Sequence, residues 1–227
     1  MKPAKPAKTI ADLFEEFLAD QKDRIGPKTF GKYEDIISLY GSYLENYWPG
    51  HDDEATKITK AGGTYCKTFG PEELLDGYDE FLGYFMPRKV MCGKETMQAA
   101  GSVTKKLAKW LAEKGYISDT EDAQERAGEA AKDLPNALKI LDILSGIVDG
   151  TSPPRHRGAI SDHFMIEKIE PGQLWLQPVM AYPSTTVGPV SVPTEVTALC
   201  KIGWDIGGVL MKRGKGWELV EVWNVTP

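Results

Sequence analysis

Apolar residues in the first part of the chain recur at helical spacing. After Thr9, a residue type favoured at N-caps, they fall on one helical face at Ile10, Leu13, Phe14, Phe17 and Leu18. Gly26-Pro27 breaks this helix, and a second helix follows that the Trp48-Pro49-Gly50 stretch ends. The same spacing predicts further helices from Pro71 through Phe85, from about Lys94 to Lys114, and over about 120–133 and 135–148, the last opened by Pro135.

The last third of the chain has the pattern of short strands instead. We predict strands at Phe164–Ile169, Gln173–Leu176, Val187–Val192, Ile206–Lys212 and Trp217–Val225, with a short helix over 193–201. Alternation along the last strand places Trp217, Leu219 and Trp223 on one face and Val220 and Val222 on the other. Because both faces are apolar, we expect this strand to meet another layer, such as the helix over 135–148 or a second subunit. The fold class is therefore α+β with two domains, an all-α N-terminal bundle and a small antiparallel β-barrel.

Composition divides the chain at the same place. Residues 150–159, which include Pro-Pro and two glycines, form the best linker. We expect a flexible Pro/Lys arm at 1–8, a helical domain at 9–117, a helical connector with its linker at 118–159, and the barrel at 160–227.

Charge and hydropathy exclude several classes of protein. The 227 residues include 27 basic and 33 acidic ones, which gives a net charge of −6 and excludes a broadly polycationic protein. The mean hydropathy is −0.33, and no stretch is long and apolar enough to span a bilayer, so we expect no membrane partner. The start lacks the apolar segment of a secretory signal, and three widely spaced cysteines favour reduced thiols. We therefore expect a cytoplasmic protein.

Two stretches within 9–117 carry a family resemblance. The first, 9–46, is a helix, a break with Pro-x-Thr and a second helix; the second, 94–117, contains Thr96, Leu107, Trp110-Leu111, Gly115 and Ile117. Residues 9–117 resemble the N-terminal core-binding, SAM-like domain of phage integrases, the tyrosine recombinases. The resemblance implies a four-helix domain that grips DNA as half of a clamp. The predicted barrel resembles Src-homology-type barrels.

The catalytic domain of that family has no counterpart here. Its chemistry needs a His-x-x-Arg motif, two arginines, a lysine and a nucleophilic tyrosine. His156 is followed at the third position by Ala159 and His163 by Ile166, and Tyr182 is the only tyrosine after Tyr116. We therefore expect no enzyme activity, no catalytic residues and no cofactor.

A local excess of positive charge suggests what the helical domain does. Between Met86 and Ile117, seven basic and two acidic residues give +5. Gln98, Ser102, Lys105 and Lys109 follow one line of the helix, opposite the apolar residues Met97, Leu107 and Leu111. Lys28 and Thr29 match a second contact position of the family. The candidate DNA-binding residues are Lys28, Thr29, Lys94, Gln98, Ser102, Lys105, Lys106 and Lys109.

Other interpretations stay open. The lysines are also explained as the solvated face of an amphipathic helix. The chain could instead be a protein-interaction scaffold or a homodimer that uses the barrel and the helix over 135–148. A metal site at His51–Glu54 is disfavoured, because adjacent residues on one loop rarely converge on an ion. Cys92 lies near basic residues that could lower its pKa, but with no base in view we treat it as an inert thiol. Four tryptophans of the strand region (Trp175, Trp204, Trp217 and Trp223) fit a core better than a ligand groove.

Overall fold

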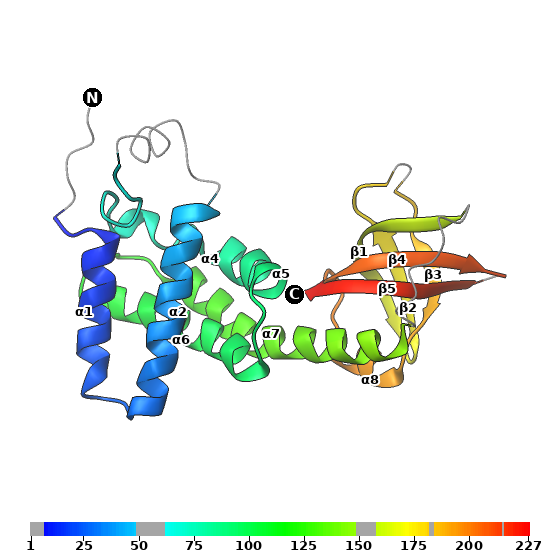
Figure 1. Cartoon of the computed structure of the whole chain (residues 1–227), viewed down its shortest axis with the longest axis horizontal. Helices are drawn as coiled ribbons and strands as arrows, with labels where there is room; N and C mark the ends of the chain where they lie inside the picture. The colour runs from blue at the N-terminus through cyan, green and yellow to red at the C-terminus, as the bar shows by residue number, and fades with distance from the viewer. Residues whose placement is uncertain (1–6, 49–61, 149–157, 182–183, 215) are drawn as a thin grey trace. The chain divides into compact units, whose positions relative to one another are not determined.

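The fold is α+β, with helices in the N-terminal part and a five-stranded sheet in the C-terminal part, as the sequence predicts (Figure 1). The computed structural model describes residues 7–48, 62–148, 158–181, 184–214 and 216–227. The chain separates into two compact units, Met1–Lys132 and Asp133–Pro227. This division lies inside the segment 118–159 that we expected to connect two domains. Within the described ranges, no helix has both the length and the apolar character needed to cross a membrane.

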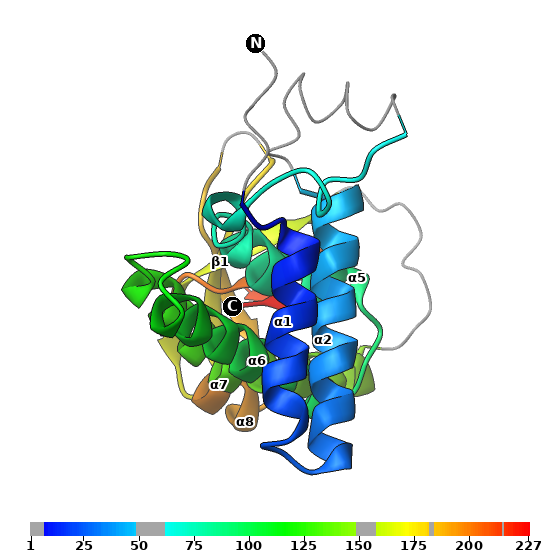
Figure 2. The same ribbon diagram turned by 90° about the vertical axis from the view of Figure 1, so that its left-hand side faces the viewer.

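The first unit is built on three long helices, α1 (Ile10–Lys22), α2 (Pro27–Asn46) and α6 (Lys94–Glu113). Figure 2 shows α1 and α2 side by side. The predicted N-cap is confirmed, because Thr9 Oγ1 accepts a hydrogen bond from the Asp12 amide at 3.2 Å while the Asp12 carboxylate accepts one from the Thr9 amide at 2.9 Å. The starts of α1 and α2 follow from local signals, the Thr9 capping box and Pro27 at the first helical position.

The end of α6 also follows the sequence. Gly115 has a φ of +73°, which suits glycine better than any residue with a side chain. The amides of Gly115 and Tyr116 donate to the carbonyls of Ala112 and Leu111 at 3.0 and 2.9 Å. These two bonds form a Schellman motif and satisfy carbonyls that the end of a helix would otherwise leave open.

The helix expected from Pro71 through Phe85 is instead a series of short segments. They are η1 (Pro71–Glu73), α4 (Tyr78–Glu80), the π-helical η2 (Phe81–Phe85) and α5 (Met86–Lys89). The Tyr40 hydroxyl donates to the Leu74 carbonyl and so replaces an intrahelical bond. Pro87 has no amide proton to donate to the preceding turn, so one regular backbone hydrogen bond is absent there. The apolar residues over 71–85 have helical spacing, but these contacts divide the segment into short helical pieces.

One continuous helix, α7 (Glu121–Ile147), replaces the two helices predicted over 120–133 and 135–148. Pro135 lies inside it and not at a start, at the cost of one backbone hydrogen bond. Residues on both sides of the proline are buried, namely Ala127, Leu134, Ala137, Ile140 and Leu144. This burial holds the helix together through a residue that usually ends one. The boundary between the two units, after Lys132, lies just before the proline.

In the first unit α6 and α7 cross at a glycine. A Cβ atom on Gly101 would lie 2.3 Å from the Ala131 amide nitrogen and 2.6 Å from the Ala127 carbonyl oxygen. Such distances leave no room for any side chain, and the obstacles are backbone atoms that cannot turn away. Glycine at this position therefore sets how closely the two helices approach.

We predict that Gly101→Ala destabilises the protein by about 2–4 kcal/mol, because α6 and α7 must move apart to admit the methyl group. The matched control is Gly31→Ala in α2, where a Cβ atom meets nothing within 4 Å. That change should stabilise the protein by about 0.5–1 kcal/mol, since alanine has the higher helix propensity. Urea denaturation of both variants measures the difference; a Gly101→Ala protein as stable as the parent would refute the tight crossing.

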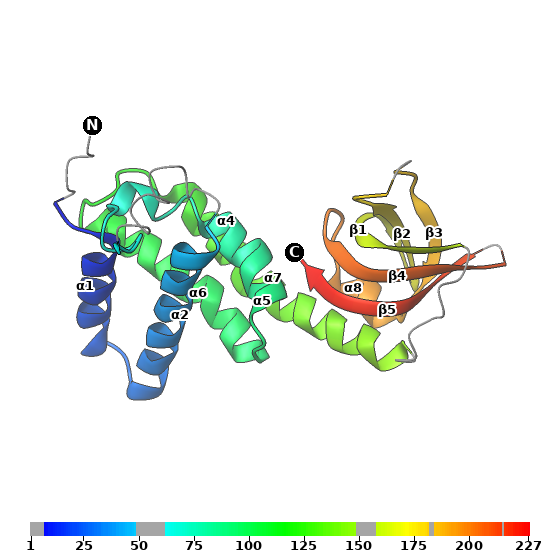
Figure 3. The same ribbon diagram turned by 45° about the horizontal axis from the view of Figure 1, so that its top comes forward.

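The second unit is organised around strands β1 (Ala159–Glu170), β2 (Gln173–Pro178), β3 (Val187–Ser191), β4 (Asp205–Arg213) and β5 (Gly216–Thr226) (Figure 3). They pair in the order β1-β2-β3-β5-β4, and β4 pairs back to β1, which closes the sheet. The short helix predicted over 193–201 is α8 (Thr194–Leu199). The expectation of a wholly antiparallel sheet is wrong, because β3 pairs with β5 in parallel. Antiparallel neighbours alternate in direction, and five strands in a ring cannot alternate all the way round.

The C-terminal half of α7 covers the core of this unit. Ala137, Ile140 and Leu144 are at most 1% exposed and pack in one cluster with residues of the sheet. The Lys201 Nζ atom donates to both carboxylate oxygens of Asp133 at 2.7 Å, so the start of this half is also held by charge. Most of the apolar stripe over 135–148 is therefore buried against the chain's own sheet. Leu219, Val222 and Val225 of β5 pack in the same cluster, so the last strand meets this helix, which was the first of the two layers we expected for that strand.

The side chains of β5 do not alternate as predicted. Two β-bulges interrupt its pairing with β4, one at Val220 and one at Trp223. Each bulge adds a residue, so Leu219, Val222 and Val225 face the core while Trp223 is 42% exposed. Gly208 pairs with Val222, between the two bulges, and a Cβ atom there would lie 2.2 Å from the Glu221 carbonyl oxygen, so the bulged strand leaves no room for a side chain at this position. Trp223 is thus not on the face of Leu219.

Candidate nucleic-acid interface

The polar line predicted on α6 is exposed. Gln98, Ser102, Lys105 and Lys109 all lie in solvent-exposed positions, whereas Leu107 and Leu111 on the opposite face are fully buried. The helix is otherwise surrounded: Trp110 packs its ring 5.5 Å from that of Phe17 in α1, and Gly101 meets α7. Packing on these sides leaves one narrow stripe of α6 open, which we call the α6 stripe.

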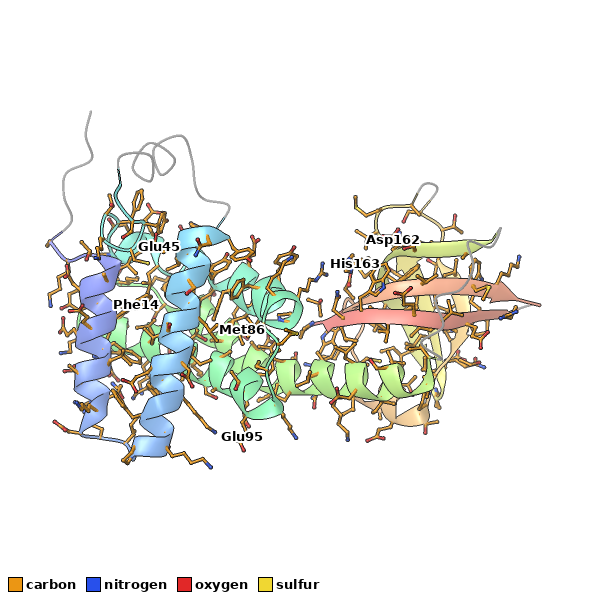
Figure 4. All side chains as sticks on the ribbon, viewed as in Figure 1. Phe14, Glu45, Met86, Glu95, Asp162 and His163 are labelled. Carbon is orange, nitrogen blue, oxygen red and sulfur yellow. The ribbon has the colours of Figure 1, made fainter. Side chains whose placement is uncertain are left out.

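Lys28 and Thr29 are exposed in the first turn of α2, close to the start of α6. Lys32 Nζ donates to Glu95 Oε2 at 2.7 Å (Glu95 is labelled in Figure 4). The pKa of the Glu95 carboxyl is lowered by this hydrogen bond and, to a lesser extent, by the nearby charge of Lys28. The structure therefore places Lys28 beside the first turn of α6, where Lys94 also lies.

Both helix starts at this corner lack a side-chain cap. The N-cap residues are Gly26 for α2 and Gly93 for α6, and neither has a side chain to accept from the first-turn amides. Each first turn carries an exposed lysine, Lys28 or Lys94. The partial positive charge of a helix N-terminus adds to these lysines, so the corner attracts anions.

The other edge of the α6 stripe is acidic. Lys105 lies across Gly128 of α7, whose absent Cβ atom would be 2.8 Å from the lysine Nζ. The first half of α7 borders an open groove of about 710 Å³ whose charged lining is Asp76, Asp79, Asp119, Asp122, Glu125, Arg126 and Glu129. A single arginine among six carboxylates leaves this groove strongly negative. A polyanion on the α6 stripe would therefore be attracted on the α2 side and repelled on the α7 side.

Part of the positive charge counted between Met86 and Ile117 is engaged elsewhere. Lys114 Nζ pairs with Asp20 at 2.8 Å and with Glu16 at 3.2 Å. Arg88 and Lys89 lie over the ring of Tyr84, at 5.0 and 5.5 Å from its centre. Within the stripe, Lys109 pairs more loosely with Glu113 at 3.6 Å, and beside the stripe Lys106 is half-buried.

Lys32 is the charged neighbour that the sequence analysis missed. It follows Lys28 by one helical turn, so the spacing of the two lysines was a usable signal. Its ion pair with Glu95 could not be foreseen, because it depends on how α2 and α6 pack together.

The remaining chemical candidates find little support. Burial raises the pKa of the Cys92 thiol, which opposes the activation that its basic neighbours in sequence suggested. Burial raises the pKa of Cys66 as well. His51–Glu54, His156 and Tyr182 lie outside the described residues. Trp204 is 5% exposed, which agrees with the core assignment, whereas Trp223 does not belong to the core.

Comparisons with known proteins give no family for the chain. No protein-family model matches it, and neither a curated protein nor a solved structure matches it at a significant level.

The pairing of Lys114 depends on a network around Glu16 in α1. The Glu16 carboxylate accepts from Lys8, from Lys114 and, at 2.8 Å, from the Tyr116 hydroxyl. The hydrogen bond from Lys8 is the largest cause that lowers the pKa of Glu16 to about 2, followed by that from Tyr116. The ionised carboxylate thereby ties the end of α6 to α1.

We predict that Glu16→Gln lowers the melting temperature at pH 7 by roughly 2–4 °C. A depressed pKa stabilises the folded state above the unfolded-state value of about 4.5, and the effect is lost as the pH falls to about 2. The difference from the parent should therefore be constant between pH 5 and 8 and should shrink between about 4.5 and about 2. Thermal melts followed by circular dichroism measure it, with Glu15→Gln at the exposed neighbouring position as the control. A difference that persists at the lowest pH would contradict this assignment.

Proposed function

We propose that this protein is a non-catalytic DNA-binding accessory protein whose helical unit, with its integrase-like sequence features, contacts the duplex without recombinase chemistry. The observation that carries the proposal is the α6 stripe: Gln98, Ser102, Lys105 and Lys109 are all exposed, and the stripe adjoins the basic first turn of α2. A packed underside with a polar, basic outer face is the arrangement that phosphate contacts require.

The roles of the residues differ. Lys28, Lys94, Lys105, Lys106 and Lys109 supply ammonium groups for phosphates. Gln98 and Thr29 add uncharged donors, which orient a backbone without adding to the salt dependence. The Ser102 hydroxyl donates to the Gln98 carbonyl at 2.9 Å and would have to turn to reach a phosphate. Base-specific contacts are not part of the proposal.

Electrostatics decides on which part of α6 a duplex would lie. Lys105 lies against α7, whose first half is rich in carboxylates, whereas the first turn of α6 lies beside Lys28, and Lys32 there pairs with Glu95. Like charges repel, so we place the duplex over α6 and the start of α2 and away from α7. The net charge of −6 keeps the affinity modest, and contacts to phosphates make it sensitive to salt, because they release bound counterions.

The finer description of the fold belongs to the same proposal. We assign α1, α2, the broken helical segment over 71–89 and α6 to the four helices of a core-binding domain, and we assign the closed sheet to the Src-homology type. What supports this is the sequence of 9–46 and 94–117 together with the confirmed starts of α1, α2 and α6.

The test is a fluorescence-anisotropy titration of the full chain with a labelled duplex at 50 and 200 mM salt. For about four phosphate contacts the dissociation constant should rise roughly 100-fold between these conditions. The double variant Lys105→Glu/Lys109→Glu should bind at least about tenfold more weakly and lower the slope of log K against log salt by about two.

The control variant, Lys67→Glu/Lys212→Glu, changes the net charge equally at two exposed lysines that are not part of α6, Lys67 in the first unit and Lys212 in the second. It should retain most of the affinity, which separates a local contact from a general charge effect. Absence of binding at 50 mM salt would remove the proposal, and so would equal losses in the two double variants.

A protein-interaction scaffold remains the second candidate function. The apolar stripe of 135–148, on which it partly depended, is buried by the chain's own sheet. The other surface named in that hypothesis is the sheet, and the exposure of Trp223 on its outside favours a protein-binding role for the sheet.

A further inference from the structure

The outer surface of the sheet carries a group of exposed apolar and aromatic residues. Met165, Val179, Met180 and Trp223 are 37%, 56%, 82% and 42% exposed. The fifth residue of the group is His163, which lies on β1 and is labelled in Figure 4. We call these five residues the His163 patch.

Strand register brings the patch together from separate parts of the chain. The Val179 amide donates to the His163 carbonyl at 2.9 Å, and Met165 follows His163 by two positions on the same face of β1. The Trp223 ring stands edge-on to the His163 ring, with 6.1 Å between their centres. Strands β1, β4 and β5 and the end of β2 therefore all contribute to one surface.

A buried carboxylate fixes the part of the patch that follows β2. Asp162 is only 5% exposed and accepts hydrogen bonds from the amides of Met180, at 3.0 Å, and Ala181, at 2.7 Å. It also accepts from the His163 amide at 2.7 Å. Burying a charged group costs free energy unless such bonds offset it. Here the bonds hold a backbone segment whose side chains, Val179 and Met180, face solvent.

The orientation of His163 is fixed as well. Its Nδ1 atom lies 2.9 Å from Asp205 Oδ1. With the ring proton on Nδ1, this contact is a hydrogen bond and Nε2 is left as an acceptor. The ring lies against Gly207, where a Cβ atom would be 2.8 Å from the imidazole Cε1. Any other residue at 207 would displace the ring.

A third feature that shapes the patch is the bulge at Trp223, which places the indole on the outer face of the sheet. Beneath it, Asn224 Oδ1 is buried and accepts no hydrogen bond from the described residues. A bulge, a glycine and two carboxylates thus hold exposed side chains in place. Rigid, exposed aromatic surface of this kind is typical of docking sites, because little entropy is lost when a partner binds.

The charge around the patch selects the class of partner. The strand segments that form it, 159–165, 176–181, 205–209 and 221–226, contain no lysine or arginine. Asp162 is buried and bonded to amides, but Asp205 and Glu221 are partly exposed, so a phosphate backbone would be repelled here. An indole ring bordered by acidic groups and hydrogen-bond acceptors suits a cation, since the face of an aromatic ring attracts positive charge.

We propose that the His163 patch docks a cationic side chain, arginine or lysine, presented by a segment of a partner protein. The cation lies on the Trp223 indole and donates to Glu221 and to His163 Nε2, while Met165 and Val179 pack against its aliphatic stem. This site is in the second unit and does not depend on DNA binding by the first.

The test uses the ¹⁵N-labelled full chain and three blocked peptides, Gly-Val-X-Val-Gly, in which X is arginine, lysine or the uncharged isostere citrulline. The indole N–H signal of Trp223 is identified by its loss in Trp223→Phe. We expect this signal to shift saturably with the arginine or the lysine peptide at about 0.1–5 mM, and the better of the two identifies the preferred cation. Citrulline should bind at least about tenfold more weakly.

Two variants with a matched control locate the site. Trp223→Ala and Glu221→Gln should each weaken the cationic peptide by about three- to tenfold, with the Gly207 and Val225 amide signals as readout. Glu218→Gln removes a carboxylate from an exposed position on the same strand and should leave binding unchanged. Equal binding of citrulline and arginine peptides, no saturable shift up to about 5 mM, or a larger Trp223 shift with a DNA oligonucleotide would each overturn the proposal.

Discussion

Burial of α6 on nearly every side is the constraint on which the first unit depends. The helix meets α1 through Trp110, whose indole N–H donates to Asp20 at 2.9 Å, and meets α7 through the bare backbone of Gly101. The Tyr78 hydroxyl donates to its Thr104 carbonyl at 3.0 Å. A helix held this way has only one stripe left for solvent, so the side chains on that stripe decide what the unit can bind.

Sequence periodicity predicted the parts of the fold that are decided locally. Thr9 starts a helix through its cap, Pro27 starts one through the fixed φ of proline, and Gly115 ends one through its left-handed backbone; these signals do not need a folded protein to act. Pro135 shows the opposite case: its local preference is to start a helix, but buried residues on both sides keep α7 continuous. The bulges of β5 could not be predicted either, because they depend on the register in which β5 pairs with β4.

The candidate site also has one part that the sequence predicts and one that it does not. The line of Gln98, Ser102, Lys105 and Lys109 could be predicted from helical spacing alone, because the opposite positions are apolar. The charges that border this line could not be predicted, since they depend on which helices pack beside α6. Lys114 is adjacent in sequence but is paired with Glu16 and Asp20, and Lys105 turns out to lie against the acidic helix α7. Counting charges along a sequence therefore overestimates a basic surface when neighbouring elements carry carboxylates.

The two proposed surfaces have opposite preferences, and this has a consequence for how they would act together. The α6 stripe attracts polyanions, whereas the His163 patch repels them and favours cations. When the His163 patch binds a lysine or arginine of a partner, that side chain can no longer contact DNA. Binding of the partner therefore adds no positive charge to the DNA-binding surface. The α6 stripe of a second copy would itself qualify as a cationic ligand for the patch. DNA on that stripe would then compete with such self-association, and both contacts would weaken as salt increases.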